Sequence, residues 1–169
     1  VREFRKLAQN PCPAVRSTQV IAFKSLRFAS LGSGSEGNGL IIESGDARLL
    51  VDCGFSLKNC QRRLQRLGLE PGDLSAILVT HEHDDHVGGV FDLAREADIP
   101  VWLTHGTLNA VTEGARDATR DLTRNVAVHK LHGELALQIA GIDVLPYTVP
   151  HDAREPVQYR FGDGNVRLG

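Results

Sequence analysis

The chain contains no methionine and only three cysteines, and its formal charge is −2 over 169 residues. Because Cys12, Cys53 and Cys60 are odd in number and form no Cys-x-x-Cys pair, they predict reduced thiols in a cytoplasm rather than a disulfide scaffold. The small net charge provides no overall attraction to nucleic acid or to an anionic membrane. No apolar run approaches the length of a membrane span, and the first residues lack the apolar core of a signal peptide, so we expect no membrane partner.

Both ends of the chain lack features of a complete protein. Without a methionine, Val1 predicts that the natural start lies elsewhere, and the end at residues 167–169 falls within an expected strand, so we interpret the chain as a fragment. Residues 1–25 carry basic side chains without clear periodicity, so they are either a nucleic-acid-binding arm or a poorly ordered N-terminal extension. The length and the ordinary hydrophobic content of 41% predict one folded domain.

One stretch concentrates ligand-type side chains, namely Thr-His-Glu-His-Asp-Asp-His at residues 80–86, which reads His-x-His-x-Asp-His. Residues 76–80 are apolar and rich in β-branched types, which predicts a buried strand, so the cluster follows a strand end, where α/β proteins commonly place their sites. Neutral imidazoles and a carboxylate are good ligands for zinc and similar divalent ions. A polar loop rich in histidine by chance is the alternative, and four ligand-type residues at this spacing argue against it.

The spacing also assigns positions to the individual side chains. His81 and His83 project to the same side of the last extended residues. The aspartate of the pattern is Asp85, which leaves Glu82 and Asp84 to face solvent or substrate. Asp85 and His86 come after the chain has turned, so their side chains point at a position beside that of His81 and His83.

Turn residues and hydrophobic periodicity outline the remaining elements. We expect helices over residues 56–67, 87–97 and 108–119, and strands over 26–31, 40–43, 48–51, 101–104, 126–131, 135–139, 142–149, 156–161 and from 166 onward. In the first helix the basic side chains of Lys58, Arg62, Arg63 and Arg66 lie opposite the apolar face, and we interpret them as solvated rather than as a stripe that binds phosphates.

The histidine motif resembles the signature of the metallo-β-lactamase superfamily, whose fold sandwiches two mixed β-sheets between helices. The likeness extends to Leu-Leu-Val-Asp-Cys-Gly at residues 49–54 and to Val-Pro-His-Asp at 149–152. Residues 30–38, Ser-Leu-Gly-Ser-Gly-Ser-Glu-Gly-Asn, resemble the opening of small bacterial members regarded as phosphodiesterases or DNA exonucleases. The resemblance implies an α/β (α+β) fold, an αββα sandwich whose N-terminal part spans residues 26–169 and which is incomplete at the C-terminus. Because the resemblance starts only at Leu26, we expect residues 1–25 to be a poorly ordered N-terminal extension rather than a nucleic-acid-binding arm.

The resemblance also implies a set of metal ligands. His81, His83 and His151 would hold one divalent ion, zinc or manganese, with an open fourth position. Asp85, which we also expect to be catalytic, and His86 would begin a second site. The family completes that site with a bridging aspartate and a further histidine, both C-terminal to the matched segment. We therefore expect two ions in the full-length protein and one or fewer in this chain.

The glycine-serine loop has three interpretations. Residues 32–37 match Gly-x-Gly-x-x-Gly, but that dinucleotide fingerprint requires a helix after the last glycine, and a strand is expected there, so we reject a dinucleotide site. A plain flexible turn is the second interpretation. The resemblance implies the third, a loop beside the active site whose Ser33, Ser35 and Asn38 hydrogen-bond substrate. Asp52, after the third expected strand, is either a carboxylate that steadies the metal ligands from below or a turn residue.

Three functions are compatible with these residues. The first is an intracellular metal-dependent phosphodiesterase or nuclease that acts on a phosphodiester, such as single-stranded DNA or a cyclic nucleotide. The second is a thioesterase of the glyoxalase kind, which would share every ligand, and the third is a metal-binding remnant without activity. His86 favours the first two, because an imidazole directly after the aspartate is the pattern of superfamily hydrolases that act on phosphodiesters and thioesters. True metallo-β-lactamases usually lack that histidine and are secreted.

Overall fold

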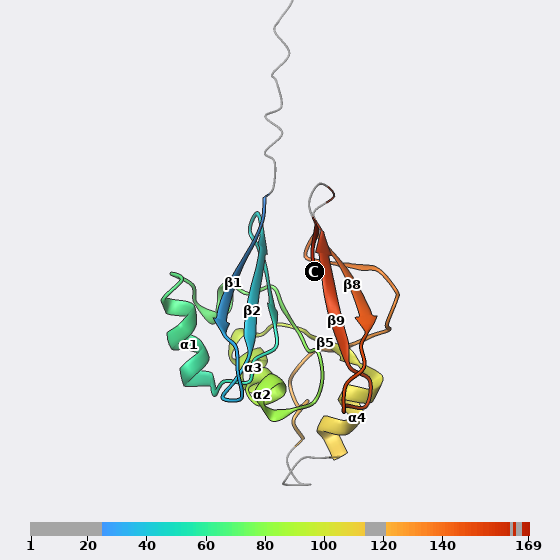
Figure 1. The fold of residues 1–169 in the computed structure, drawn as a ribbon. Helices are drawn as coiled ribbons and strands as arrows, with labels where there is room; N and C mark the ends of the chain where they lie inside the picture. Colours follow the sequence, from blue (N-terminus) through green and yellow to red (C-terminus); the bar gives the residue numbers. More distant parts are fainter. Residues whose placement is uncertain (1–24, 114–120, 163, 165–166) are drawn as a thin grey trace, which may run out of the picture.

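The computed structural model describes residues 25–113, 121–162, 164 and 167–169, and it contains two β-sheets that face each other (Figure 1). The first sheet consists, in spatial order, of β1 (Leu26–Gly32), β2 (Gly39–Ser44), β3 (Ala47–Val51), β4 (Ala76–Leu78), β5 (Val101–Thr104) and β6 (Val128–Leu131). The second sheet has the order β10 (Arg167–Leu168), β9 (Val157–Gly162), β8 (Ile142–Thr148) and β7 (Leu137–Ile139). The helices are α1 (Leu57–Gln65), α2 (Asp84–Val87), α3 (Val90–Ala97) and α4 (His105–Glu113), with a 3-10 turn at Pro71–Asp73.

The first sheet changes from antiparallel to parallel at β3. Strands β1, β2 and β3 pair antiparallel, and the β2–β3 turn uses Gly45 at a φ of 60°, a conformation that glycine adopts without strain. Strands β3 to β6 pair in parallel, so each needs a crossover connection, and the helices supply it. Because parallel strands end at the same edge of the sheet, the residues after β3 and after β4 come together there.

Two hydrophobic cores lie on opposite faces of the first sheet. Leu50 and Ile77 face the helices and pack in one cluster with Leu64 and Phe91. The alternate residues of the same strands, among them Leu49 and Leu78, pack against the second sheet, whose contribution includes Ile142, Val144 and Phe161. Residues 49–51 of β3 and all of β4 are apolar and buried, as expected for strands that are covered on both faces.

These layers confirm the predicted mixed α/β fold. Helix, sheet and sheet form three of the four layers of the predicted αββα sandwich (Figure 1). The predicted extension over residues 1–25 lies outside the described residues except for Ser25, so it stays a prediction. In the part of the chain that the structure describes, no helix has the length and apolar character needed to cross a membrane.

The helix boundaries differ from the predicted ones. Of the expected helix over residues 87–97, residues 90–97 form α3, whereas Val87 ends α2 and the chain turns at residues 88–89. Gly89 is required at this turn, because a Cβ there would lie 1.9 Å from the carbonyl oxygen of Phe55. α4 begins at His105, three residues before the expected start, and the end expected at Thr119 lies outside the described residues. The predicted strands over 126–131 and 135–139 begin two residues later, at Val128 and Leu137.

Arg63 corrects the interpretation of the basic stripe on α1. Its guanidinium lies over the ring of Phe55, 4.1 Å from the centroid, and donates a hydrogen bond to the carbonyl oxygen of Leu31. Lys58, Arg62 and Arg66 are exposed, as predicted. The Phe55 ring also fills the space above Gly32 and Gly37, where an added Cβ would meet ring carbons at 2.9 and 2.6 Å. Gly32 and Gly37 of the glycine-serine loop therefore leave room for the ring of Phe55.

Candidate metal centre

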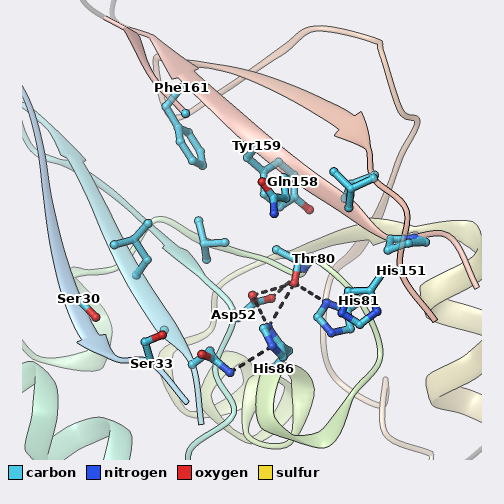
Figure 2. A pocket seen from close by; sticks show the side chains of 18 of the residues that line it. Ser30, Ser33, Asp52, Thr80, His81, His86, His151, Gln158, Tyr159 and Phe161 are labelled. Atoms are coloured by element: carbon cyan, nitrogen blue, oxygen red, sulfur yellow. Dashed lines mark hydrogen bonds and ion pairs between the residues drawn. The ribbon is translucent and has the colours of Figure 1, made fainter. Parts of the chain in front are cut away.

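Three histidines from two distant loops converge at the end of β4. His81 and His83 follow β4 directly, and His151 lies in the connection between β8 and β9. One ligand atom from each residue lies within 4.8 Å of the others, so the three side chains form a group that could hold a metal ion. The ring centroid of His81 lies 4.7 Å from that of His83 and 4.4 Å from that of His151. The structure thus brings the predicted first site together, and Figure 2 shows His81 and His151 side by side.

Contacts between the two sheets bring the loops together. The backbone N–H of Val157, at the start of β9, donates to the carbonyl oxygen of Thr80 at 3.0 Å. Further along β9, the buried hydroxyl of Tyr159 donates to the carbonyl oxygen of Val79 at 2.6 Å. Because β9 is thereby fixed to the end of β4, the loop before β9 places His151 over the histidines that follow β4.

Asp52 lies beneath the three-histidine cluster and hydrogen-bonds Thr80 and His86 beside it. The residue is 5% exposed and has a positive φ of 60°, which aspartate tolerates better than most residues. Its carboxylate accepts hydrogen bonds of 2.8 Å from the N–H of Thr80, from the hydroxyl of Thr80 and from Nδ1 of His86 (Figure 2). Of the two predicted interpretations, these contacts agree with a carboxylate beneath the site rather than with a simple turn residue.

The same contacts determine which nitrogen of each imidazole is free. A carboxylate oxygen only accepts, so Nδ1 of His86 carries the hydrogen, and in the neutral imidazole Nε2 keeps its lone pair. The hydroxyl of Thr80 donates to Asp52 and can therefore accept from Nδ1 of His81, which lies 2.9 Å away. On His151, Nδ1 lies 2.6 Å from Oδ1 of Asp152. In all three residues Nε2 is left available as a ligand.

The imidazoles of His81, which is buried, and His86, which is half-buried, differ in their affinity for protons. Burial lowers the pKa of His81 to about 4, and the nearby imidazoles of His86, His151 and His83 act in the same direction against the charge of Asp52. A neutral His81 offers a lone pair at neutral pH. Burial also lowers the pKa of His86, but the hydrogen bond and charge of Asp52 outweigh burial and raise that pKa above its ordinary value.

Replacement of Asp52 by alanine is expected to lower the free energy of unfolding by about 2–3 kcal/mol. The substitution leaves the N–H of Thr80 and Nδ1 of His86 without their acceptor in a mostly buried site. Urea unfolding of the metal-free protein measures the effect. Asp46→Ala, which removes an exposed turn carboxylate, serves as the control and should change the value by less than about 0.5 kcal/mol. Equal effects of the two substitutions would contradict a structural role for Asp52.

Glu82 corrects a second prediction, because its side chain faces the protein rather than solvent or substrate. Oε1 of Glu82 accepts the backbone N–H of Arg154 at 2.8 Å, and Oε2 is buried. Glu155 adds a second connection, since its carboxylate accepts the N–H of Gly106 at 2.6 Å at the start of α4. The loop that carries His151 is therefore hydrogen-bonded on one side to Glu82, in the segment after β4, and on the other to the start of α4. Asp84, in contrast, is exposed.

Loss of the Glu82 carboxylate is expected to weaken metal binding. Glu82→Ala removes the acceptor for Arg154 and frees the His151 loop, so we expect an affinity about tenfold lower. Glu82→Gln keeps an oxygen acceptor and should bind metal like the unchanged protein. Competition with a chromophoric chelator measures both constants. An alanine variant as tight as the glutamine variant would show that this hydrogen bond does not position His151.

Asp85 and His86 lie in α2, beside the three histidines, as the spacing predicted. Their side chains approach each other, with Oδ2 of Asp85 3.7 Å from Nε2 of His86. Of the three loop residues predicted to contact substrate, Ser33 and Asn38 line the neighbouring cleft, whereas Ser35 is exposed and does not line it. The amide of Asn38 also lies within hydrogen-bonding distance of Asp85 and His86, at 3.1 Å from each.

Tight backbone contacts hold the turn after β3 against α2. The N–H of Cys53 donates to the carbonyl oxygen of His86 at 2.8 Å, and the carbonyl oxygen of Cys53 accepts from Gly89 at 2.8 Å. Gly54 lies closer still, since a Cβ there would meet the carbonyl oxygen of Asp85 at 1.8 Å. Glycine at residue 54 thus allows α2 and the turn after β3, which contains Asp52, to come into contact.

A cleft of about 580 Å³ between the two sheets borders the site. Its floor includes Thr80, His81 and His86, and its walls combine polar side chains with apolar ones (Figure 2). The apolar residues include Leu40, Val51, Val157, Tyr159 and Phe161, and the polar ones include Ser30, Ser33 and Gln158. The cleft gives a ligand access to the histidines.

Sequence comparisons agree with this geometry. Residues 33–166 match the metallo-beta-lactamase superfamily. Exodeoxyribonuclease YycJ of Bacillus anthracis is 37% identical over 145 residues, which make up 85% of this chain and 52% of that protein. Exodeoxyribonuclease WalJ of Streptococcus pneumoniae is 34% identical over 139 residues, or 80% of this chain and 49% of that protein. The chain therefore spans about half the length of the curated relatives it matches.

Structural comparisons establish the same fold. Rm3 metallo-beta-lactamase aligns with a TM-score of 0.66 over 83% of this chain and 56% of its own, at 18% identity. MEM-A1, a subclass B3 metallo-beta-lactamase from a soil metagenome library, aligns with a TM-score of 0.63 over 86% of this chain and 58% of its own, at 18% identity. Members of the superfamily bind divalent metals, commonly zinc. From the match over residues 33–166 and the shared two-sheet fold, the chain belongs to the metallo-β-lactamase superfamily.

Proposed function

We propose that the chain is part of a metal-dependent hydrolase that cleaves phosphodiesters, most specifically a nuclease. The observation that carries the proposal is the convergence of His81, His83 and His151, whose ligand atoms lie within 4.8 Å of one another. Three imidazoles that leave a fourth position open are the donor set of a catalytic rather than a structural zinc site. A bound divalent ion would lower the pKa of a coordinated water to around 7 and stabilise charge on phosphoryl oxygens.

The residues around the histidines have defined tasks in this proposal. Asp52 orients His86 directly and His81 through the hydroxyl of Thr80, so each imidazole presents Nε2. Glu82 holds the loop of His151 in place through its hydrogen bond to Arg154. These contacts fix the ligand geometry before an ion binds, so little ordering is left for the binding step.

A second ion is proposed for the position of Asp85 and His86. The 3.7 Å between Oδ2 of Asp85 and Nε2 of His86 lets one ion with bonds of about 2.0–2.2 Å reach both atoms. Among the described residues, the trio of His81, His83 and His151 is the only group of three or more side chains that could hold an ion. We therefore propose tight binding of one ion and weaker binding of another, as zinc or manganese.

The choice of phosphodiester substrates rests on two supports. His86 adds an imidazole beside the first three, and a dinuclear site concentrates positive charge where a phosphodiester gathers negative charge during attack. The exodeoxyribonucleases of Bacillus anthracis and Streptococcus pneumoniae are similar to more than three quarters of this chain. We propose single-stranded DNA as the substrate, and a cytoplasmic location because Cys53 and Cys60 are both free thiols.

A side-by-side substrate panel tests the proposed function. With manganese or zinc added, the protein receives an aryl phosphodiester, 5′-labelled single-stranded DNA, a glutathione thioester and a chromogenic cephalosporin. We expect cleavage of the two phosphodiesters, lost in His151→Ala and retained in His105→Ala, which changes an exposed histidine outside the site. Preferential turnover of the thioester would favour a glyoxalase-like enzyme. Cleavage of the cephalosporin alone would contradict the role given to His86, and no turnover with bound metal would favour a remnant without activity.

A further inference from the structure

Asn38, the last residue of the glycine-serine loop, contacts Asp85 and His86, the two side chains of the proposed second metal site. Nδ2 of Asn38 lies 3.1 Å from Oδ2 of Asp85 and 3.1 Å from Nε2 of His86. Oδ1 accepts the backbone N–H of Gly34 at 3.0 Å, which orients the amide with its NH₂ group toward Asp85 and His86. One side-chain amide therefore serves both proposed ligands of the second ion.

The lone pair of His86 cannot serve two partners at once. Because Nδ1 of His86 donates to Asp52, Nε2 has a single lone pair, and Asn38 donates a hydrogen to it. A metal ion would need that same lone pair to bind His86. The amide of Asn38 and a second ion are thus alternatives at Nε2.

The surroundings of Asn38 allow the side chain to release His86 without the loss of all its partners. The backbone is fixed, since its N–H donates to the carbonyl oxygen of Asp85 at 2.7 Å and its own carbonyl accepts from Gly54 at 3.0 Å. The two hydrogens of Nδ2 have four acceptors within reach, because the carbonyl oxygens of Gly34 and Asp85 lie at 3.2 and 3.1 Å. Two of these acceptors remain when both metal ligands are taken by an ion.

We propose that Asn38 controls the binding of a second divalent cation to Asp85 and His86. Its amide holds the two side chains together while that ion is absent, and it gives up Nε2 of His86 when the ion binds. Asn38 acts through other residues and is a positioning residue. The inference rests on the proposed metal-dependent function and adds to it a residue that decides how readily the dinuclear state forms.

Zinc titrations of Asn38→Ala and Asn38→Asp test the proposal, with Ser35→Ala as an exposed control in the same loop. After the first ion is bound, we expect Asn38→Ala to bind the second about three- to tenfold more tightly than the unchanged protein, because no hydrogen bond to Nε2 must be broken. Asn38→Asp should bind it more tightly still, because its carboxylate is a further ligand. Ser35→Ala should match the unchanged protein. Unaltered or weaker binding of the second ion in both Asn38 variants overturns the proposal.

Spectroscopy of the unchanged protein provides a test that needs no variant. In ¹⁵N–¹H spectra, the side-chain NH₂ signals of Asn38 should shift together with the Nε2 signal of His86 as the second equivalent of zinc is added. A shift of His86 without a shift of Asn38 contradicts the proposal. The first equivalent of zinc tests binding to His81, His83 and His151 separately. If no first ion binds, the proposed function fails, whatever the result for Asn38.

Discussion

Metal bound to the purified chain is expected to fall from about one divalent ion per molecule to almost none when His83 is replaced by alanine. The substitution removes one of three converging imidazoles, and the remaining two ligands cannot hold an ion tightly in a site with an open position. The ring of His83 contacts those of His81 and His151, so its loss disturbs little besides the ligand set. Metal analysis after dialysis measures the stoichiometry.

His105→Ala is the matched control for this experiment. His105 is exposed at the start of α4, and its Nε2 lies 3.1 Å from Nδ2 of Asn109. The control should keep the full amount of metal. Two tightly held ions that persist in His83→Ala, or an equal loss of metal in both variants, would show that the ligand assignment is wrong.

The second large effect concerns stability and comes from Gly54. Gly54→Ala is expected to lower the free energy of unfolding by more than about 4 kcal/mol, or to prevent folding. A Cβ at residue 54 would lie 1.8 Å from the carbonyl oxygen of Asp85 and 2.1 Å from its carbonyl carbon. Both are backbone atoms of α2, so they cannot move aside as a flexible side chain could. Urea unfolding monitored by circular dichroism measures the change.

Gly72→Ala is the control for the glycine substitution. Nothing lies within 4 Å of a Cβ built on Gly72, and no positive φ restricts that residue. We therefore expect its free energy of unfolding to change by less than about 0.5 kcal/mol. A Gly54→Ala protein as stable as Gly72→Ala would contradict the close contact between the Asp52 turn and α2.

Sequence reasoning identified the candidate ligands that are close together in the chain. The offsets among His81, His83, Asp85 and His86 follow from one strand end and one helical turn, both of which are local features. His151 is 65 residues from His86, so its assignment depended on a family resemblance rather than on periodicity. The strands were predicted well for the same reason, because alternation and apolar runs reflect local burial.

Residues whose partners are distant in the chain were the ones misjudged. Glu82 was expected to face solvent or substrate, yet its acceptor role depends on Arg154, 72 residues away. Arg63 has the charge of a solvated helix residue, and only the position of Phe55 and Leu31 shows why it packs inward. For Asp52 two interpretations stayed open, because its contacts with Thr80 and His86 require the β3 and β4 ends to be adjacent. No pattern within the sequence reports such pairings.

The direct test of the metal centre is an anomalous-scattering map from crystals of the protein grown with zinc. The three-histidine site predicts a strong peak about 2.0–2.1 Å from one nitrogen each of His81, His83 and His151. Any weaker peak should lie between Asp85 and His86. A strong peak elsewhere, or a first ion held by Asp85 and His86 without the three histidines, would contradict the central claim.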